Sequence, residues 1–188
     1  MSSLGRPICQ IAFPGRPFFA FPIMSLQQRL QRQLQSTRQM SEKLLADFKT
    51  PHDWVHQVHP GCNHALWFAG HMANTDNFLL SLVSPASSVS LEGWSARFGM
   101  GSQPTDQPEA YPPPEKVLAT MRERRAKLLE VLSKLSDDDL AKKTPDGAPE
   151  FLPDFASVFE LAIWHEGLHA GQLSVTRRAL GHKPLVGA

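Results

Sequence analysis

The sequence predicts an all-α protein, a four-helix bundle with a long crossover between its second and third helices. Four stretches of roughly twenty residues repeat apolar residues at steps of three and four, the period of a helix with one buried face. No stretch alternates apolar and polar residues as a half-buried strand would. A connection of roughly thirty residues separates the second stretch from the third, which is an arrangement that helix bundles use.

The first predicted helix follows Ser25, a residue type that caps helix N-termini, and is ended by Pro51. Its apolar stripe consists of Leu26, Leu30, Leu34, Met40, Leu44, Leu45 and Phe48. The preceding residues 1–23 contain four prolines, which interrupt the apolar run that a secretory signal needs. We therefore expect residues 1–23 to be a poorly structured extension and residues 24–188 to form the bundle domain.

The second helix is predicted from about Asn63, as its cap, to Val83. The crossover that follows is rich in Ser, Gly and Pro, and loops of this length are usually disordered or line a functional site. It closes with prolines 112–114, which can precede a helix but not lie inside one. The third helix is predicted over about residues 114–135, and Ser136 with the three aspartates after it indicates a short helical turn.

The fourth helix is predicted over about residues 154–180. Ser157 and Glu160 have the spacing of a capping box near its start. Gly181 suits the position after its end, because glycine adopts the left-handed conformation that terminates many helices.

Composition and charge argue against several functions. Nineteen Lys and Arg against eighteen Asp and Glu give a formal charge of +1, whereas nucleic-acid-binding proteins normally carry a basic excess. We interpret the basic clusters at 122–127 and 177–178 as solvated helix faces and expect no nucleic-acid partner. The two cysteines lie far apart, which suits a reducing cytosol, and no apolar run reaches the length of a membrane helix. A cytoplasmic protein without a membrane partner is the expectation.

Among eight histidines, His165 and His169 are the most informative. At i and i+4 of a helix, their rings share one face. We expect both to point inward, together with Leu161, Ala162, Leu168, Gln172 and Leu173. A buried polar group without a partner costs about 1–3 kcal/mol, and a metal ion would satisfy one nitrogen of each ring.

His71, in the second predicted helix, is the expected third metal ligand, because bundle sites are built from side chains on facing helices. Three histidines with open positions for water are typical of catalytic rather than structural sites. The alternative is that each histidine is simply a hydrogen-bonded core residue. His64 lies on the same stripe of the second predicted helix as His71. We interpret the remaining four histidines as surface residues: His52, His56, His59 and His182.

Residues 165–169 also spell HExxH, the zinc-protease signature, with Glu166 as the general base. That function needs a third ligand further along the chain. After His169 there is no Asp or Glu, and His182 offers the only nitrogen ligand. We therefore disfavour a protease and expect Glu166 either to face outward or to orient a ligand histidine.

Residues 63–71 and 165–173 resemble the start of the second helix and the last helix, with its HxxxHxGQL run, of the DinB-like (damage-inducible) four-helix-bundle family. Residues 94–102 and 111–112 resemble the crossover of one branch, and the likeness covers roughly residues 25–180. The resemblance implies an often dimeric bundle with one metal ion on three histidines. Position by position, these are His71, His165 and His169. Characterised members of the family include thiol-dependent transferases and isomerases.

We therefore expect a divalent-metal-dependent enzyme, a thiol-dependent transferase or a hydrolase, that acts on a small molecule. Zinc or nickel is the favoured metal, with iron or manganese as alternatives, and a low-molecular-weight thiol is the expected co-substrate. The alternative is a non-catalytic metal-binding or stress-associated bundle. A second copy of the chain, in a homodimer, is the further expected partner.

Three residues are candidates for proton transfer or for orienting the ligands: His64, Asp76 and Glu166. A solvated position on the helix is the alternative for Asp76. Three large aromatic residues are candidates for the wall of the site, although such residues are also typical of a plain core: Trp67, Trp94 and Phe98.

Overall fold

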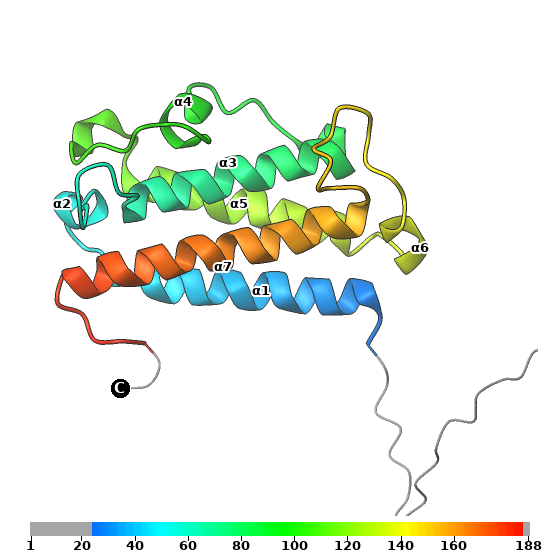
Figure 1. Cartoon of the computed structure of the whole chain (residues 1–188), viewed down its shortest axis with the longest axis horizontal. Coiled ribbons are helices and arrows are strands. Elements are labelled where there is room, and N and C mark those ends of the chain that lie inside the picture. Colours follow the sequence, from blue (N-terminus) through cyan, green and yellow to red (C-terminus); the bar gives the residue numbers. More distant parts are fainter. Residues whose placement is uncertain (1–23, 186–188) are drawn as a thin grey trace, which may run out of the picture.

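The computed structural model describes residues 24–185, so the extension expected at residues 1–23 lies outside the described residues. Within the described part, the chain forms seven α-helices and no strand, which confirms the all-α prediction (Figure 1). The four long helices are α1 (Leu26–Leu45), α3 (Ala65–Val83), α5 (Pro114–Leu132) and α7 (Phe155–Ala179). The short helices are α2 (Pro51–Trp54), α4 (Trp94–Phe98) and α6 (Asp137–Leu140), and two 3₁₀ turns lie at Pro85–Ser87 (η1) and Pro108–Ala110 (η2).

The four long helices form one bundle. Helix α3 packs against both α5 and α7, and α1 packs against both α7 and α5. Because the crossover carries the chain back along the bundle through α4 and η2, α5 runs in the same direction as α3, and α7 runs in the opposite direction (Figure 1). This topology places α3 and α7 side by side, and these two helices carry the predicted metal ligands.

Capping residues set the helix ends. Ser25 caps α1 as predicted, within a reciprocal capping box. At the start of α7, the predicted box is wrong: Asp154 is the cap, and Ser157 is its reciprocal partner, so Glu160 takes no part. Gly181 follows the last helix with a φ of 89°, the left-handed conformation expected after a helix end.

The bundle core consists of two apolar clusters. The first surrounds the early turns of α3 together with α2 and α4, and includes Trp54, Trp67, Phe68, Phe98 and Met121. The second fills the opposite end, and includes Leu34, Leu79, Leu128, Leu140 and Phe159. Each long helix contributes one buried charged residue to a shared ion-pair network that falls between residues of the two clusters: Arg38, Asp76, Arg125 and Glu166. We call these four residues the charged layer.

The interpretation of the basic clusters as solvated helix faces is wrong for three arginines. Arg124 and Arg125 are 3% and 2% exposed, and Arg177 is 6% exposed and paired with Asp47. In α1, Arg38 occupies the core-facing position near which Met40 was expected, and Met40 itself is 40% exposed. The arginines reach the interior because acidic or carbonyl groups there accept their N–H groups.

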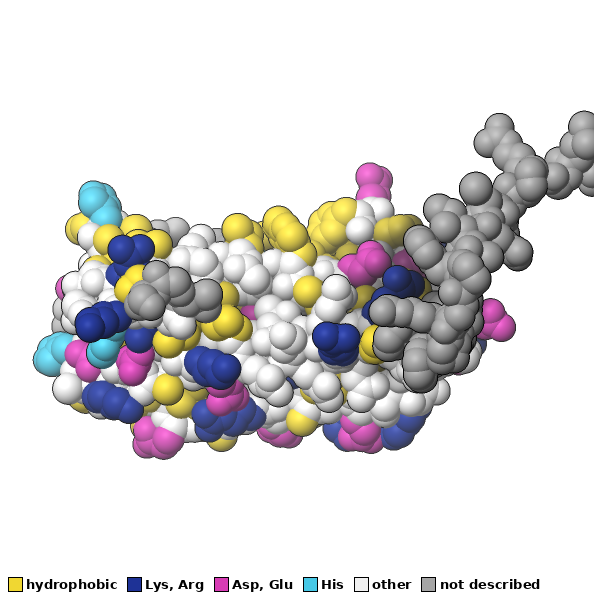
Figure 2. Space-filling view, turned by 90° about the horizontal axis from the view of Figure 1, so that it is seen from below, with side chains coloured by type: hydrophobic (Ala, Val, Ile, Leu, Met, Phe, Trp, Pro, Cys, Tyr) yellow, Lys and Arg dark blue, Asp and Glu magenta, His cyan; other side chains and the backbone are white. Residues whose placement is uncertain are grey.

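The face of the bundle in Figure 2 mixes basic and acidic side chains, and hydrophobic side chains gather along one of its edges. Helix α7 contributes large exposed apolar residues, namely Trp164, Leu168 and Val175. Leu168 was expected to face inward but is 49% exposed. None of the helices in residues 24–185 combines the length and apolar character that a membrane span requires.

Candidate metal centre

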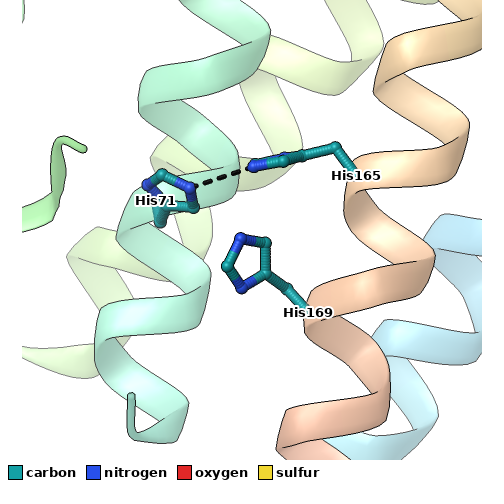
Figure 3. Close-up of side chains that lie close together, drawn as sticks. All are labelled: His71, His165 and His169. Carbon is teal, nitrogen blue, oxygen red and sulfur yellow. Dashed lines mark hydrogen bonds between the residues drawn. The ribbon is translucent and has the colours of Figure 1, made fainter. Parts of the chain in front are cut away.

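Three histidine rings converge between α3 and α7. His71 reaches across from α3, and His165 and His169 face it from successive turns of α7 (Figure 3). One ring nitrogen from each residue lies within 4.8 Å of the others, and the Nε2 atoms of His71 and His165 are 3.2 Å apart. The structure thus brings together the three residues that the sequence singles out.

Hydrogen bonds on the outer side of two rings fix which nitrogen carries the proton. His71 Nδ1 donates to the carbonyl oxygen of Phe98 at 2.6 Å, and His169 Nδ1 donates to Gln172 Oε1 at 2.9 Å. A carbonyl oxygen can only accept, so Nε2 of each neutral ring carries the lone pair. That of His71 lies within hydrogen-bonding distance of His165 Nε2, at 3.2 Å. The amide of Asn63 donates to the same Gln172 oxygen at 3.1 Å and holds it in place.

Burial keeps the rings neutral. It lowers the pKa of His71 to about 4, against a smaller opposing effect of the Phe98 carbonyl. Burial also lowers the pKa of His165 to about 4, with the neighbouring histidines adding to the effect, and it lowers the pKa of His169. Near pH 7, all three rings therefore offer lone pairs rather than protons, which is the state that a metal ligand requires.

Aromatic side chains enclose one side of the centre. The indole of Trp67 stacks on His71 with ring centroids 4.3 Å apart and an interplanar angle of 17°, and its centroid is 5.6 Å from that of His169. Trp67 Nε1 donates to Ser102 Oγ at 2.8 Å, which ties the indole to the crossover. Phe98 packs on Trp94 and supplies its backbone carbonyl to His71. Of the three expected aromatic residues, Trp67 therefore contacts the ligand rings with its side chain, Phe98 contacts one through its backbone, and Trp94 packs behind Phe98.

These residues fit a divalent metal ion. A tetrahedral ion with nitrogen ligands at 2.0–2.1 Å separates those nitrogens by about 3.3 Å, close to the spacing of His71 and His165. His165 Nδ1 is buried without a hydrogen-bond partner, and Nε2 is the nitrogen that faces His71 (Figure 3). Three neutral imidazoles suit zinc, nickel or iron better than they suit magnesium or calcium.

The three further candidate residues do not join the centre. His64 is the N-cap of α3, in place of the expected Asn63, and its Nδ1 accepts the Trp67 backbone N–H at 3.0 Å. Burial lowers the pKa of His64 to about 4, which keeps this acceptor unprotonated. Asp76 and Glu166 are 1% and 0% exposed and are paired with arginines.

These placements correct two expectations. The alternative that Asp76 is solvated is wrong, as is an outward position for Glu166. Because consecutive residues of a helix point about 100° apart, Glu166 faces the bundle interior while His165 faces α3. A protease base must reach solvent and substrate, and the paired, buried Glu166 does neither.

The sequence did not indicate all the residues that hold the rings. The Phe98 carbonyl is a backbone group of the crossover, and every residue type carries such a group, so the sequence gives no signal for it. Gln172 lies three residues after His169, a spacing that places the two side chains together on one helix face. That spacing is a usable sequence signal for the hydrogen bond. The expectation that Gln172 faces inward is wrong, because its side chain is exposed.

Gly70 explains how the crossover approaches so closely. A Cβ atom at this position would overlap the Phe98 ring, whereas a Cβ at Gly167 of α7 would meet nothing within 4 Å. We expect Gly70→Ala to displace Phe98 and to lower stability by about 1–3 kcal/mol. Gly167→Ala should raise it by about 0.5–1 kcal/mol through helix propensity. Urea unfolding of the two variants measures both effects, and equal behaviour would contradict this packing.

Comparisons with known proteins agree with the all-α fold. The sequence profile of the DinB superfamily matches residues 33–173. A solved structure described as the conserved protein of a locus from Enterococcus faecalis superposes with a TM-score of 0.66 at 18% identity. The superposition covers 85% of this chain and 100% of the other, and at that identity it concerns the fold alone. A search of curated proteins found no match.

Proposed function

The chain belongs to the DinB superfamily, and from that premise we propose that it is a divalent-metal-dependent enzyme, a thiol-dependent transferase or a hydrolase acting on a small molecule. The observation that carries the proposal is the convergence of three neutral imidazoles on one point between α3 and α7. A metal held by three neutral ligands supplies a Lewis acid with open positions, which lowers the pKa of a thiol or water that it binds.

The surrounding residues are suited to that chemistry. The hydrogen bonds to Phe98 and Gln172 orient two ligand rings without adding negative charge to the site. Within the described part of the chain, no carboxylate belongs to the histidine cluster. The full positive charge of the ion would therefore be available to an anionic group such as a thiolate.

One observation favours a non-catalytic metal-binding bundle as the second candidate. The two carboxylates nearest in sequence to the ligands, Asp76 and Glu166, are paired with arginines and cannot act as a general base. A hydrolase would have to manage proton transfer without them. A thiol-dependent reaction depends less on such a base, because a thiol ionises more readily than water.

Cobalt substitution tests the proposal. We expect 2-mercaptoethanol at millimolar concentration to change the visible absorption spectrum of the cobalt-loaded protein, because sulfur would join the three nitrogens as a ligand. The matched control is the methyl thioether of the same compound, which cannot form a thiolate and should leave the spectrum unchanged. No response to the thiol would make the non-catalytic bundle the better description.

A further inference from the structure

The charged layer is a closed ring with one residue from each long helix. Arg38 Nε lies 2.7 Å from Glu166 Oε1, and Arg38 Nη2 lies 3.1 Å from Asp76 Oδ2. Arg125 contacts both Asp76 oxygens at 2.9 Å, and its Nη1 lies 2.8 Å from Glu166 Oε2. No side chain in the ring is more than 8% exposed. Two positive and two negative charges thus compensate one another away from solvent.

The arginines also bind the backbones of neighbouring helices. Arg38 of α1 donates to the carbonyl oxygen of Met121 in α5 at 2.8 Å, and Arg125 of α5 donates to that of Leu34 in α1 at 3.2 Å. Hydrogen bonds from a planar guanidinium hold only over a narrow range of angles and distances. The layer therefore fixes the relative height and rotation of the helices that it joins.

Stability alone does not account for such a layer. Well-packed apolar residues in place of a buried ion cluster often leave stability unchanged or raise it, because ions lose their hydration on burial. The best-attested use of buried charges is to specify how helices register against one another. In this chain, the layer separates two apolar clusters whose contacts are not directional by themselves.

The layer lies close to the histidines along both helices. Glu166 directly follows His165 in α7, and Asp76 follows His71 in α3 by five residues, a little more than one helical turn. A metal site tolerates errors of only about 0.2 Å in ligand distance. Rotating a helix by about 20° moves a side chain near its outer radius by about 2 Å, which would destroy such a site.

We propose that the charged layer positions α7 against α3, so that Glu166 holds His165 and His169 at the correct distance from His71. Glu166 is thus a positioning residue, which acts through its ion pairs with Arg38 and Arg125. The part of this inference that concerns metal binding rests on the proposed function. The part that concerns the positions of the three histidine rings does not, because those positions can be measured in the metal-free protein.

Glu166→Gln tests the inference, because it keeps the shape of the side chain and removes its charge. We expect zinc affinity, measured by competition with a chromophoric chelator, to fall at least tenfold, the range found for groups that orient metal ligands. The control is Leu132→Ala in the remote apolar cluster, which should lower the melting temperature but leave zinc affinity unchanged. Equal zinc affinity of Glu166→Gln and wild type would overturn the inference.

Proton NMR of the metal-free protein gives the second measurement. The ring centroid of His71 lies 4.9 Å from that of His165 and 4.8 Å from that of His169. Nuclear Overhauser effects should therefore be observed between the ring protons of His71 and those of the other two histidines. These nuclear Overhauser effects should weaken in Glu166→Gln and persist in Leu132→Ala. Their persistence in both variants would overturn the inference.

The two experiments separate the inference from the proposed function. A wild type without zinc affinity would refute the proposed function, while the NMR result would still decide the role of Glu166. If Glu166→Gln does not fold, Glu166→Asp, which retains the charge but draws it back by one methylene, replaces it.

Discussion

Replacing His165 or His169 with alanine is expected to abolish stoichiometric metal in the purified protein, and His71→Ala is expected to do the same. Each ring supplies one of three nitrogens, and the two histidines that remain in each variant would compete poorly with buffer and water for the ion. Elemental analysis after dialysis should therefore show about one ion per wild-type chain, as expected for a single site with three protein ligands. These variants should contain close to none.

Two controls make the assignment specific. His52→Ala removes an exposed histidine of α2 and should leave the metal content unchanged. His64→Ala removes the cap of α3, so it should cost about 1 kcal/mol of stability while the metal is retained. Full occupancy in His71→Ala together with loss in His64→Ala would show that the ligand on α3 has been assigned to the wrong residue.

The helices themselves could be predicted because their signals are local. Apolar period, prolines and caps located all four long helices, and Ser136 with its aspartates correctly indicated α6. The errors lie at helix ends, where several residues of similar type compete for one role. Asn63 is a better capping residue type than His64, yet the structure uses His64, because its ring is held within the core beside Tyr111.

The short helix α4 could not be predicted in the same way. Its five residues carry too little periodicity for a sequence pattern, and Gly99 ends it at once. Its place depends on Phe98 packing over Gly70, a contact between residues that are 28 positions apart. The carbonyl that orients His71 follows from that packing, so sequence reasoning found the ligand but not what holds it.

The charged layer was missed although its signal is present in the sequence. Arg125 lies four residues after Met121 and three before Leu128, both of which are buried, so it continues the core-facing stripe of α5. Arg38, Asp76 and Glu166 lie at the equivalent core positions of the other three helices. Read one helix at a time, each charge suggests a boundary residue. Only the four together, two positive and two negative, indicate a compensated interior ring.

Asp76→Asn is expected to produce a large loss of stability. Asp76 is 1% exposed and accepts hydrogen bonds from both arginines of the layer. Without its charge, two buried guanidinium groups share one carboxylate, and breaking a buried ion pair in this way costs about 3–5 kcal/mol. For a domain of this size, the melting temperature should fall by about 6–20 °C. Glu42→Gln, which breaks the exposed pair with Arg122, should change stability by less than about 1 kcal/mol.

Restoring the charge balance separates electrostatics from lost packing. Adding Arg38→Met to Asp76→Asn leaves Arg125 paired with Glu166, so one positive and one negative charge remain in the core. The double variant should be more stable than the sum of the two single effects implies, by about 0.5–3 kcal/mol, because each single variant leaves an uncompensated charge that the double variant lacks. Urea unfolding of the four proteins in the cycle measures this coupling. Strictly additive losses would mean that the layer acts through packing, and that its charges do not depend on one another.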